Sequence, residues 1–193
     1  LKSIDQWSGV DIGTHSFGQG LATTGIQLTT AMSIIANDGI YVKPRLIKYF
    51  QNKNKTRLKG IPVQEKERII SEKTAYEVKK SLYNVVERGT AKNIRIKGYT
   101  LAGKTGTAQK AKENGLGYAP GKYIASFLGF FPVEDPQIVI LVSIDSPKKG
   151  YYGSTVAGPV FKKCAEFIID YYNIPPNSIK TKLKQSISKV NRL

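Results

Sequence analysis

The segment Tyr99-Thr100-Leu101-Ala102-Gly103-Lys104-Thr105-Gly106-Thr107-Ala108-Gln109 decides how the rest of this chain is understood. Side chains alternate between the two faces of a strand, so Thr105 and Thr107 are expected to point one way and Lys104 the other. Two hydroxyls then stand side by side, where they can hold a carboxylate. Gly106 lies between them, and glycine within a strand often marks a place where a ligand comes close. The segment predicts a strand edge along which a peptide substrate can lie.

The same region also matches a phosphate-binding loop, since Gly98–Thr105 fits the formula G-x-x-x-x-G-K-[ST]. In addition, the apolar run Ile138–Asp145 ends in an acid, as the magnesium-holding strand of a nucleotide hydrolase does. A phosphate loop must follow a buried strand and open a helix. Here residues 92–98 are basic and polar, and residues 110–121 contain three glycines and a proline. A nucleotide hydrolase is therefore the less favoured alternative.

Several short motifs follow one another between residues 10 and 172: Ser16–Gly20, Ala36–Gly39, Glu87–Ala91, Ala102–Gln109, Gly129–Pro132, and Tyr151–Gly153 before Val156–Phe161. In this order they resemble the C-terminal half of the transpeptidase domain of a class B penicillin-binding protein, a family with a Lys-Thr-Gly element. The first and last motifs are more similar to the division-type branch than to the elongation-type branch. The family usually has proline where Gly25 stands, so we expect the helix there to start less firmly.

The resemblance implies an α+β fold, shared with serine β-lactamases, in which an antiparallel sheet is packed with helices. It implies a peptidoglycan D,D-transpeptidase that transfers an acyl group through a serine ester to a neighbouring stem-peptide amine, binds β-lactams, and uses no metal or other cofactor. By resemblance, Lys104 joins the hydrogen bonds around the nucleophile. Thr105, Gly106 and Thr107 bind the substrate carboxylate, and the Thr107 backbone N–H completes the oxyanion hole. A β-lactam-binding sensor module of the same fold is the second possibility.

The family nucleophile and its second motif, Ser-x-x-Lys and Ser-x-Asn, are expected before the Lys-Thr-Gly strand. The chain contains no Ser-x-Asn, and its Ser-x-x-Lys matches, Ser146–Lys149 and Ser186–Lys189, follow that strand in a loop and a polar tail. We interpret both as chance matches, because the nucleophile needs a buried helix start. We expect residues 1–172 to form the C-terminal portion of a transpeptidase domain, which needs its missing N-terminal half, and residues 173–193 to form a basic tail. The chain alone is expected to be inactive.

The net charge of +16 is concentrated in Lys43–Lys59, with seven bases and no acid, and in Ile179–Leu193, with five bases and no acid. Such runs are either solvated surfaces or sites for an anionic partner. The resemblance favours an anionic cell envelope or membrane surface, and no motif for nucleic-acid binding accompanies the charge. It also implies a place on the outer face of the cytoplasmic membrane beside the division or elongation machinery, with the anchor outside this chain.

The chain has one cysteine and one histidine, and each says less about function than the motifs above. Cys164 falls on a stripe at helical spacing, which predicts a core residue; the stripe is Val160, Phe161, Cys164, Phe167, Ile168 and Tyr171. His15 is the only histidine, so a histidine cluster for metal or a histidine-dependent triad cannot be built within the chain. Beside Ser16 it could reach the rim of the site, but a loop role is preferred.

Turn and capping residues divide the remaining chain into elements. We expect a loop over Leu1–Thr23, a helix from Thr24 to Ala36, a hairpin about Asn52–Lys55, a helix from Ser71 to Glu87, strands near Tyr99–Gln109, Ile124–Phe131 and Ile138–Ile144, and a last helix over Val156–Tyr172.

Overall fold

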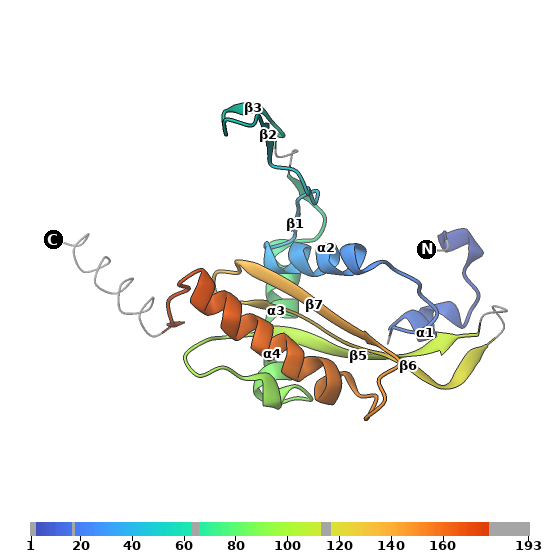
Figure 1. The fold of residues 1–193 in the computed structure, drawn as a ribbon. Helices are drawn as coiled ribbons and strands as arrows, with labels where there is room; N and C mark the ends of the chain where they lie inside the picture. Colours follow the sequence, from blue (N-terminus) through green and yellow to red (C-terminus); the bar gives the residue numbers. More distant parts are fainter. Residues whose placement is uncertain (1–2, 17, 63–65, 113–116, 178–193) are drawn as a thin grey trace.

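The computed structural model describes residues 3–16, 18–62, 66–112 and 117–177 (Figure 1). The elements follow one another as η1 (Ile4–Gln6), α1 (Asp11–Ser16), α2 (Gly25–Ala36), β1 (Ile40–Tyr41), β2 (Tyr49–Gln51), β3 (Arg57–Gly60), β4 (Glu67–Arg68), α3 (Glu72–Glu87), η2 (Lys92–Ile94), β5 (Ala102–Ala111), β6 (Tyr118–Phe131), β7 (Ile138–Asp145) and α4 (Gly153–Tyr171). The α+β class expected from the sequence is confirmed.

An antiparallel sheet in the order β5-β6-β7 forms the centre of the molecule. Its apolar side chains alternate between two faces, because neighbouring residues of a strand point to opposite sides. Phe127 and Phe131 pack with Phe161 of α4 (Gly153–Tyr171), a helix that lies along one face of the sheet in Figure 1. Phe130, which lies between these two phenylalanines in the sequence, packs with Met32 of α2 in a second cluster on the other face of the sheet. The sheet is therefore covered on both sides, and β5 is left as an edge strand.

The two helices before the sheet begin where the capping residues predict. The Thr24 side chain accepts a hydrogen bond from the Gln27 N–H, and Gln27 in turn accepts one from the Thr24 N–H, which forms a complete capping box. This box holds the start of α2 at Gly25 without the proline usual in the family. Ser71 caps α3 in the simpler way, by accepting a hydrogen bond from the Thr74 N–H.

The expectation that Leu1–Thr23 is a loop is wrong in its described part, which contains η1 and α1. Ser8 stands before α1, and both its N–H and its hydroxyl donate to the Asp11 carboxylate, at 2.6 and 2.9 Å. The reach of an acidic side chain back to the N–H of a residue three positions earlier is one half of a capping box; the other half is absent, because the Asp11 N–H donates to the Ser8 carbonyl oxygen. The signal Ser-x-x-Asp was present in the sequence, but the surrounding glycines obscured it.

The expected hairpin is confirmed, and two antiparallel pairs build it. β1 pairs with β4 at its base, and β2 pairs with β3 farther out. The connecting turn contains Asn52, whose side chain accepts a hydrogen bond from the Thr56 N–H. Figure 1 shows the β2–β3 part standing away from the helices and the central sheet.

The buried face of α4 differs from the stripe expected from the sequence. The buried side chains centre on Phe161, Ala165 and Ile169, whereas Phe167 is 68% exposed. Tyr171 is exposed to the same extent, and Cys164 is half-buried at the margin of the packed face. A stripe of apolar residues wider than the contact surface explains the error, because the sequence pattern does not say which part of it meets the sheet.

After α4 the chain continues to pack against the domain. Ile174 is buried in the same cluster as Phe161. The Asn177 backbone N–H donates to the Gly98 carbonyl, and its side-chain amide donates to Thr100 and Glu134. The packed part of the domain thus extends beyond the expected boundary at residue 172. Residues 178–193, which make up most of the expected tail, lie outside the described residues.

Candidate functional site on the edge strand

Lys104 and the two threonines leave β5 on opposite faces, as expected from their alternation. Lys104 lies opposite Leu128, which packs against the cluster on the α2 side. Thr105 lies opposite Phe127, which packs against α4. All three side chains are at least partly exposed, with Lys104 the most open. The edge strand therefore presents a cation on one face and two hydroxyls on the other.

Thr107 is tied to the beginning of α4. Its hydroxyl oxygen accepts a hydrogen bond from the Gly153 backbone N–H at 3.2 Å. That N–H is one of the donors that a helix start leaves without a partner in its own helix. Since the oxygen acts as an acceptor here, the Thr107 hydroxyl hydrogen stays available to donate to a carboxylate.

The contact between α4 and β5 is possible only because glycines form it. A Cβ atom built on Gly153 would lie 2.3 Å from the Ser126 carbonyl oxygen and 2.5 Å from that of Gly106. Backbone atoms cannot turn away as a flexible side chain can. Glycine at position 153 thus allows α4 to touch the strand, and this contact fixes the position of the Thr107 hydroxyl.

Thr105 meets a residue to which the sequence analysis gave no role. Its hydroxyl oxygen lies 3.3 Å from that of Thr90, which follows α3. Thr90 belongs to the motif Glu87–Ala91, so the motif was noted although its function was not. The hydrogen bond joins the end of α3 to the edge strand and holds the Thr105 side chain in place.

Three tyrosines stand at the end of the site where α4 begins. Tyr123 of β6 stacks on Tyr151, with ring centroids 4.6 Å apart, and Tyr151 packs against Tyr152. The Tyr151 hydroxyl donates to that of Tyr152, and this hydrogen bond is the main reason that the pKa of Tyr151 is raised. Tyr123 lies opposite Gln109 in the sheet, two residues beyond Thr107. The aromatic rings thus border the strand that carries the threonines.

The phosphate-loop alternative is wrong, because Gly98–Thr105 runs into strand β5 and opens no helix. Asp145, the acid that would hold magnesium in a nucleotide hydrolase, is paired with a lysine. Asp145 accepts hydrogen bonds from Lys110 on both carboxylate oxygens, each at 2.7 Å. This contact, with a further hydrogen bond from Ser146, lowers the pKa of Asp145. Asp145 therefore joins the outer ends of two strands.

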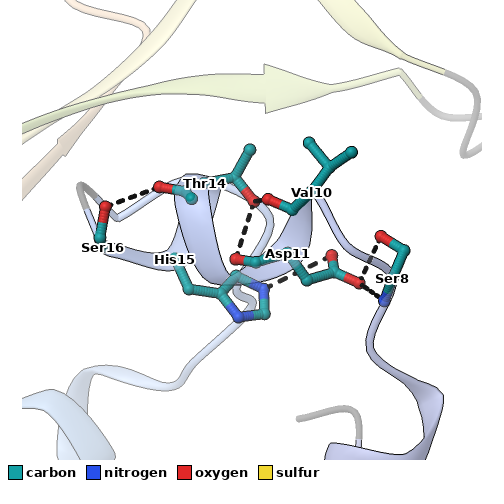
Figure 2. A network of polar contacts seen from close by, with 7 residues as sticks. Ser8, Val10, Asp11, Thr14, His15 and Ser16 are labelled. Carbon is teal, nitrogen blue, oxygen red and sulfur yellow. Dashed lines mark hydrogen bonds and ion pairs between the residues drawn. The ribbon is translucent and has the colours of Figure 1, made fainter.

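His15 and Ser16 belong to the short helix α1 and do not form a pair (Figure 2). The Ser16 hydroxyl donates to the Gly13 carbonyl oxygen at 2.6 Å. The His15 ring is turned to the other side, beside the Asp11 carboxylate at 3.8 Å and edge-on to Trp7. His15 thus packs within the N-terminal segment, in a helix and not in the expected loop.

Two hollows of the described surface lie away from Lys104–Thr107. One, of about 530 Å³, lies between α3 and residues 95–100, and the other, of about 200 Å³, lies between α2 and the start of β7. Within the described residues, no three His, Cys, Asp or Glu side chains gather as a metal site would require. The same residues contain no helix that is both long and apolar enough to span a membrane.

Comparison with known proteins gives a consistent assignment. Residues 2–166 match the family model described as the penicillin-binding protein transpeptidase domain. Stage V sporulation protein D of Bacillus subtilis is 37% identical over 163 residues, which are 83% of this chain and 25% of that protein. The probable peptidoglycan D,D-transpeptidase PenA of Neisseria meningitidis is 35% identical, over 91% of this chain and 28% of that protein.

Solved structures agree with these relatives. Penicillin-binding protein 3 of Mycobacterium tuberculosis in complex with ampicillin superimposes with a TM-score of 0.82 at 34% identity, over 91% of this chain and 41% of that one. Its complex with aztreonam gives a TM-score of 0.81. The chain thus spans between a quarter and about two fifths of the length of these relatives. With its edge strand Lys-Thr-Gly-Thr and its α+β fold, the chain belongs to the transpeptidase-domain family of the class B penicillin-binding proteins.

Proposed function

We propose that this chain supplies the substrate-carboxylate and oxyanion part of a peptidoglycan D,D-transpeptidase that also binds β-lactams. The observation that carries the proposal is the pair of threonines on the edge strand, each held by a neighbouring element. Thr105 is held by Thr90 and Thr107 by the start of α4. The relatives named as D,D-transpeptidases and the ampicillin complex of a similar structure support it.

In the proposed reaction, a serine from outside this chain attacks the carbonyl carbon of the bond between the two terminal D-alanines of a stem peptide. The terminal D-alanine leaves, and an amine of a neighbouring stem peptide then attacks the resulting serine ester. Lys104 joins the hydrogen bonds around that serine. Thr105, Gly106 and Thr107 bind the carboxylate, and the Thr107 N–H stabilises the oxyanion. A β-lactam enters the same site and stops at the ester.

The rest of the domain would complete the site on the side of α1 and α2. Large apolar side chains are exposed there, among them Val10 at 70%, Ile12 at 68% and Ile26 at 56%. Apolar surface gathered in this way usually meets another part of the protein or a partner. We propose that the portion carrying Ser-x-x-Lys and Ser-x-Asn covers it.

The relatives are bacterial penicillin-binding proteins. We propose that the intact protein works at the outer face of the cytoplasmic membrane with the division machinery, in keeping with the branch favoured by the sequence motifs. Measuring its enrichment at the division site, against a uniform or lateral distribution, tests this choice.

The 193-residue chain by itself is expected to form no covalent adduct with penicillin, whereas the intact protein is expected to form one adduct per molecule. Acylation needs an activated serine about 3 Å from the β-lactam carbonyl carbon. Ser146 lies in a loop and donates to the Asp145 carboxylate, whose pKa is lowered mainly by its hydrogen bond with Lys110, so that this carboxylate is a weak base. Incubation with a fluorescent penicillin, followed by intact-mass analysis, measures both.

A stoichiometric adduct on a serine of the isolated chain would place the nucleophile within these residues and overturn the assignment. An intact protein that forms no adduct at all would overturn the proposed function. If it is acylated but incorporates no labelled D-amino acid or stem peptide into peptidoglycan, the protein is a β-lactam sensor and not a transpeptidase.

Replacing Thr90 by valine in the intact protein is expected to lower the second-order rate constant of penicillin acylation about three- to tenfold. The change keeps the size of the side chain and removes the hydroxyl that holds Thr105. A net hydrogen bond contributes about 0.5–1.5 kcal/mol, or about two- to twelvefold in rate, and the expected change lies within these limits. Thr56→Val, in the turn between β2 and β3, is the matched control. Equal acylation of the Thr90 variant and this control would show that Thr90 does not position Thr105.

A further inference from the structure

The outer hairpin, defined as residues 43–60 with strands β2 and β3, carries a charge that the proposed site does not use. Its seven bases are Lys43, Arg45, Lys48, Lys53, Lys55, Arg57 and Lys59, and no acid accompanies them. All seven are exposed. Figure 1 shows this hairpin as the part of the molecule that stands farthest from the central sheet on its side. Like charges kept so close raise a strong local positive potential, which attracts anionic partners.

Each face of the hairpin presents an aromatic ring beside a base. On one face the Arg57 guanidinium lies 4.2 Å from the centre of the Tyr49 ring. Phe50 follows Tyr49 and so points to the other face, where it lies opposite Lys59. Planar rings offer flat apolar surfaces for stacking, while the bases offer hydrogen-bond donors for carboxylate or phosphate oxygens.

We propose that the outer hairpin binds an anionic polymer of the cell wall, one with a saccharide backbone and carboxylate groups along its length. The rings would pack on the saccharide, and the bases would pair with the carboxylates. Such a contact would hold the polymer on the protein between reactions at the edge strand. The inference rests on the proposed function, because that function brings the chain to a wall polymer of this chemistry.

A bilayer and a protein partner suit the hairpin less well. A hairpin that enters a bilayer needs an apolar surface to bury. The outermost turn here is Asn52-Lys53-Asn54-Lys55, and the exposed large apolar side chains of the hairpin, Leu46, Ile47, Phe50 and Leu58, lie in the two arms outside this turn. Five of the seven bases are lysines. Lysine is depleted in protein–protein interfaces relative to the rest of the surface, whereas a linear polyanion pairs readily with lysines spread along a hairpin.

The test is co-sedimentation of the intact protein with purified insoluble peptidoglycan, in a native form and in a form whose carboxylates have been converted to amides. Changing Lys48, Lys53 and Lys59 to glutamine is expected to weaken binding to native peptidoglycan about tenfold, because exposed ion pairs contribute little individually but add up. Lys73, Lys80 and Lys163, exposed on the helices, are changed to glutamine as the control of equal charge. The control is expected to change binding less than twofold. Amidation and high salt are expected to abolish the difference between the hairpin variant and the unchanged protein.

Penicillin acylation, measured on the same samples, is expected to be equal in all three proteins, since the hairpin lies outside the site. Loss of acylation in all three proteins would count against the proposed function. The sedimentation result would still decide the hairpin proposal. Equal sedimentation of the hairpin and control variants would overturn the hairpin proposal. The proposal would also be overturned if the hairpin variant lost binding only to vesicles of anionic lipid, because the ligand would then be a bilayer. Weaker vesicle binding of Leu46→Ser and Leu58→Ser would support that outcome.

Discussion

Replacing Thr107 by proline in the intact protein is expected to reduce β-lactam acylation at least about 100- to 1000-fold. Proline has no backbone N–H, and removal of one oxyanion donor alone lowers catalysis by this factor. The change also removes the hydroxyl that accepts from the Gly153 N–H. The second-order rate constant for a chromogenic β-lactam measures the effect.

Two further variants separate the donor from the rest of the side chain. Thr107→Ser keeps both the N–H and the hydroxyl and is expected to stay within about tenfold of the unchanged protein, since a single net hydrogen bond is weak. Cys164→Ala, on the half-buried margin of α4, is expected to keep nearly full activity. If the proline and Cys164 variants are both well folded by circular dichroism and lose acylation equally, the roles assigned to these residues are wrong.

Replacing Gly153 by alanine is expected to destabilise the protein by about 3 kcal/mol, and to lower acylation as well. The new methyl group would meet the carbonyl oxygens of Ser126 and Gly106 at distances that real Cβ atoms do not show. The helix start must then move away from β5, and overpacking of this kind typically destabilises by about 1–3 kcal/mol when side chains can still adjust. Here the obstacles are backbone atoms, so the upper end of that range applies. Urea-induced unfolding measures the loss.

Gly13→Ala is the matched control for this change. Gly13 lies within α1 and has no atom within 4 Å of the position of the new methyl group. Alanine is a better helix former than glycine by about 1 kcal/mol, so we expect equal or higher stability. If both variants unfold at the same urea concentration, the close approach of α4 to the edge strand does not limit stability.

The sequence by itself determined the edge strand, the order of the main elements from α2 to α4 and the family resemblance. Local chemistry set these features. The helix starts at Thr24 and Ser71 follow from side chains that cap backbone N–H groups a few residues away. The opposite faces of Lys104 and Thr105 follow from the alternation of a strand. The three glycines and one proline of residues 110–121 disfavoured a phosphate loop, and the structure shows that Lys104–Thr107 lies in a strand.

The tertiary structure decided every feature that depends on contacts between distant segments. The partner of Thr105 lies 15 residues away along the chain, and that of Thr107 lies 46 residues away. A motif can mark Thr90 or Gly153, but only the packing of α3 and α4 against β5 brings them to the threonines. The same packing decides that Phe161 is buried while Phe167 is exposed. A helical stripe defines which residues can face a core, whereas the position of the sheet selects those that do, because burial requires a surface supplied by other parts of the chain.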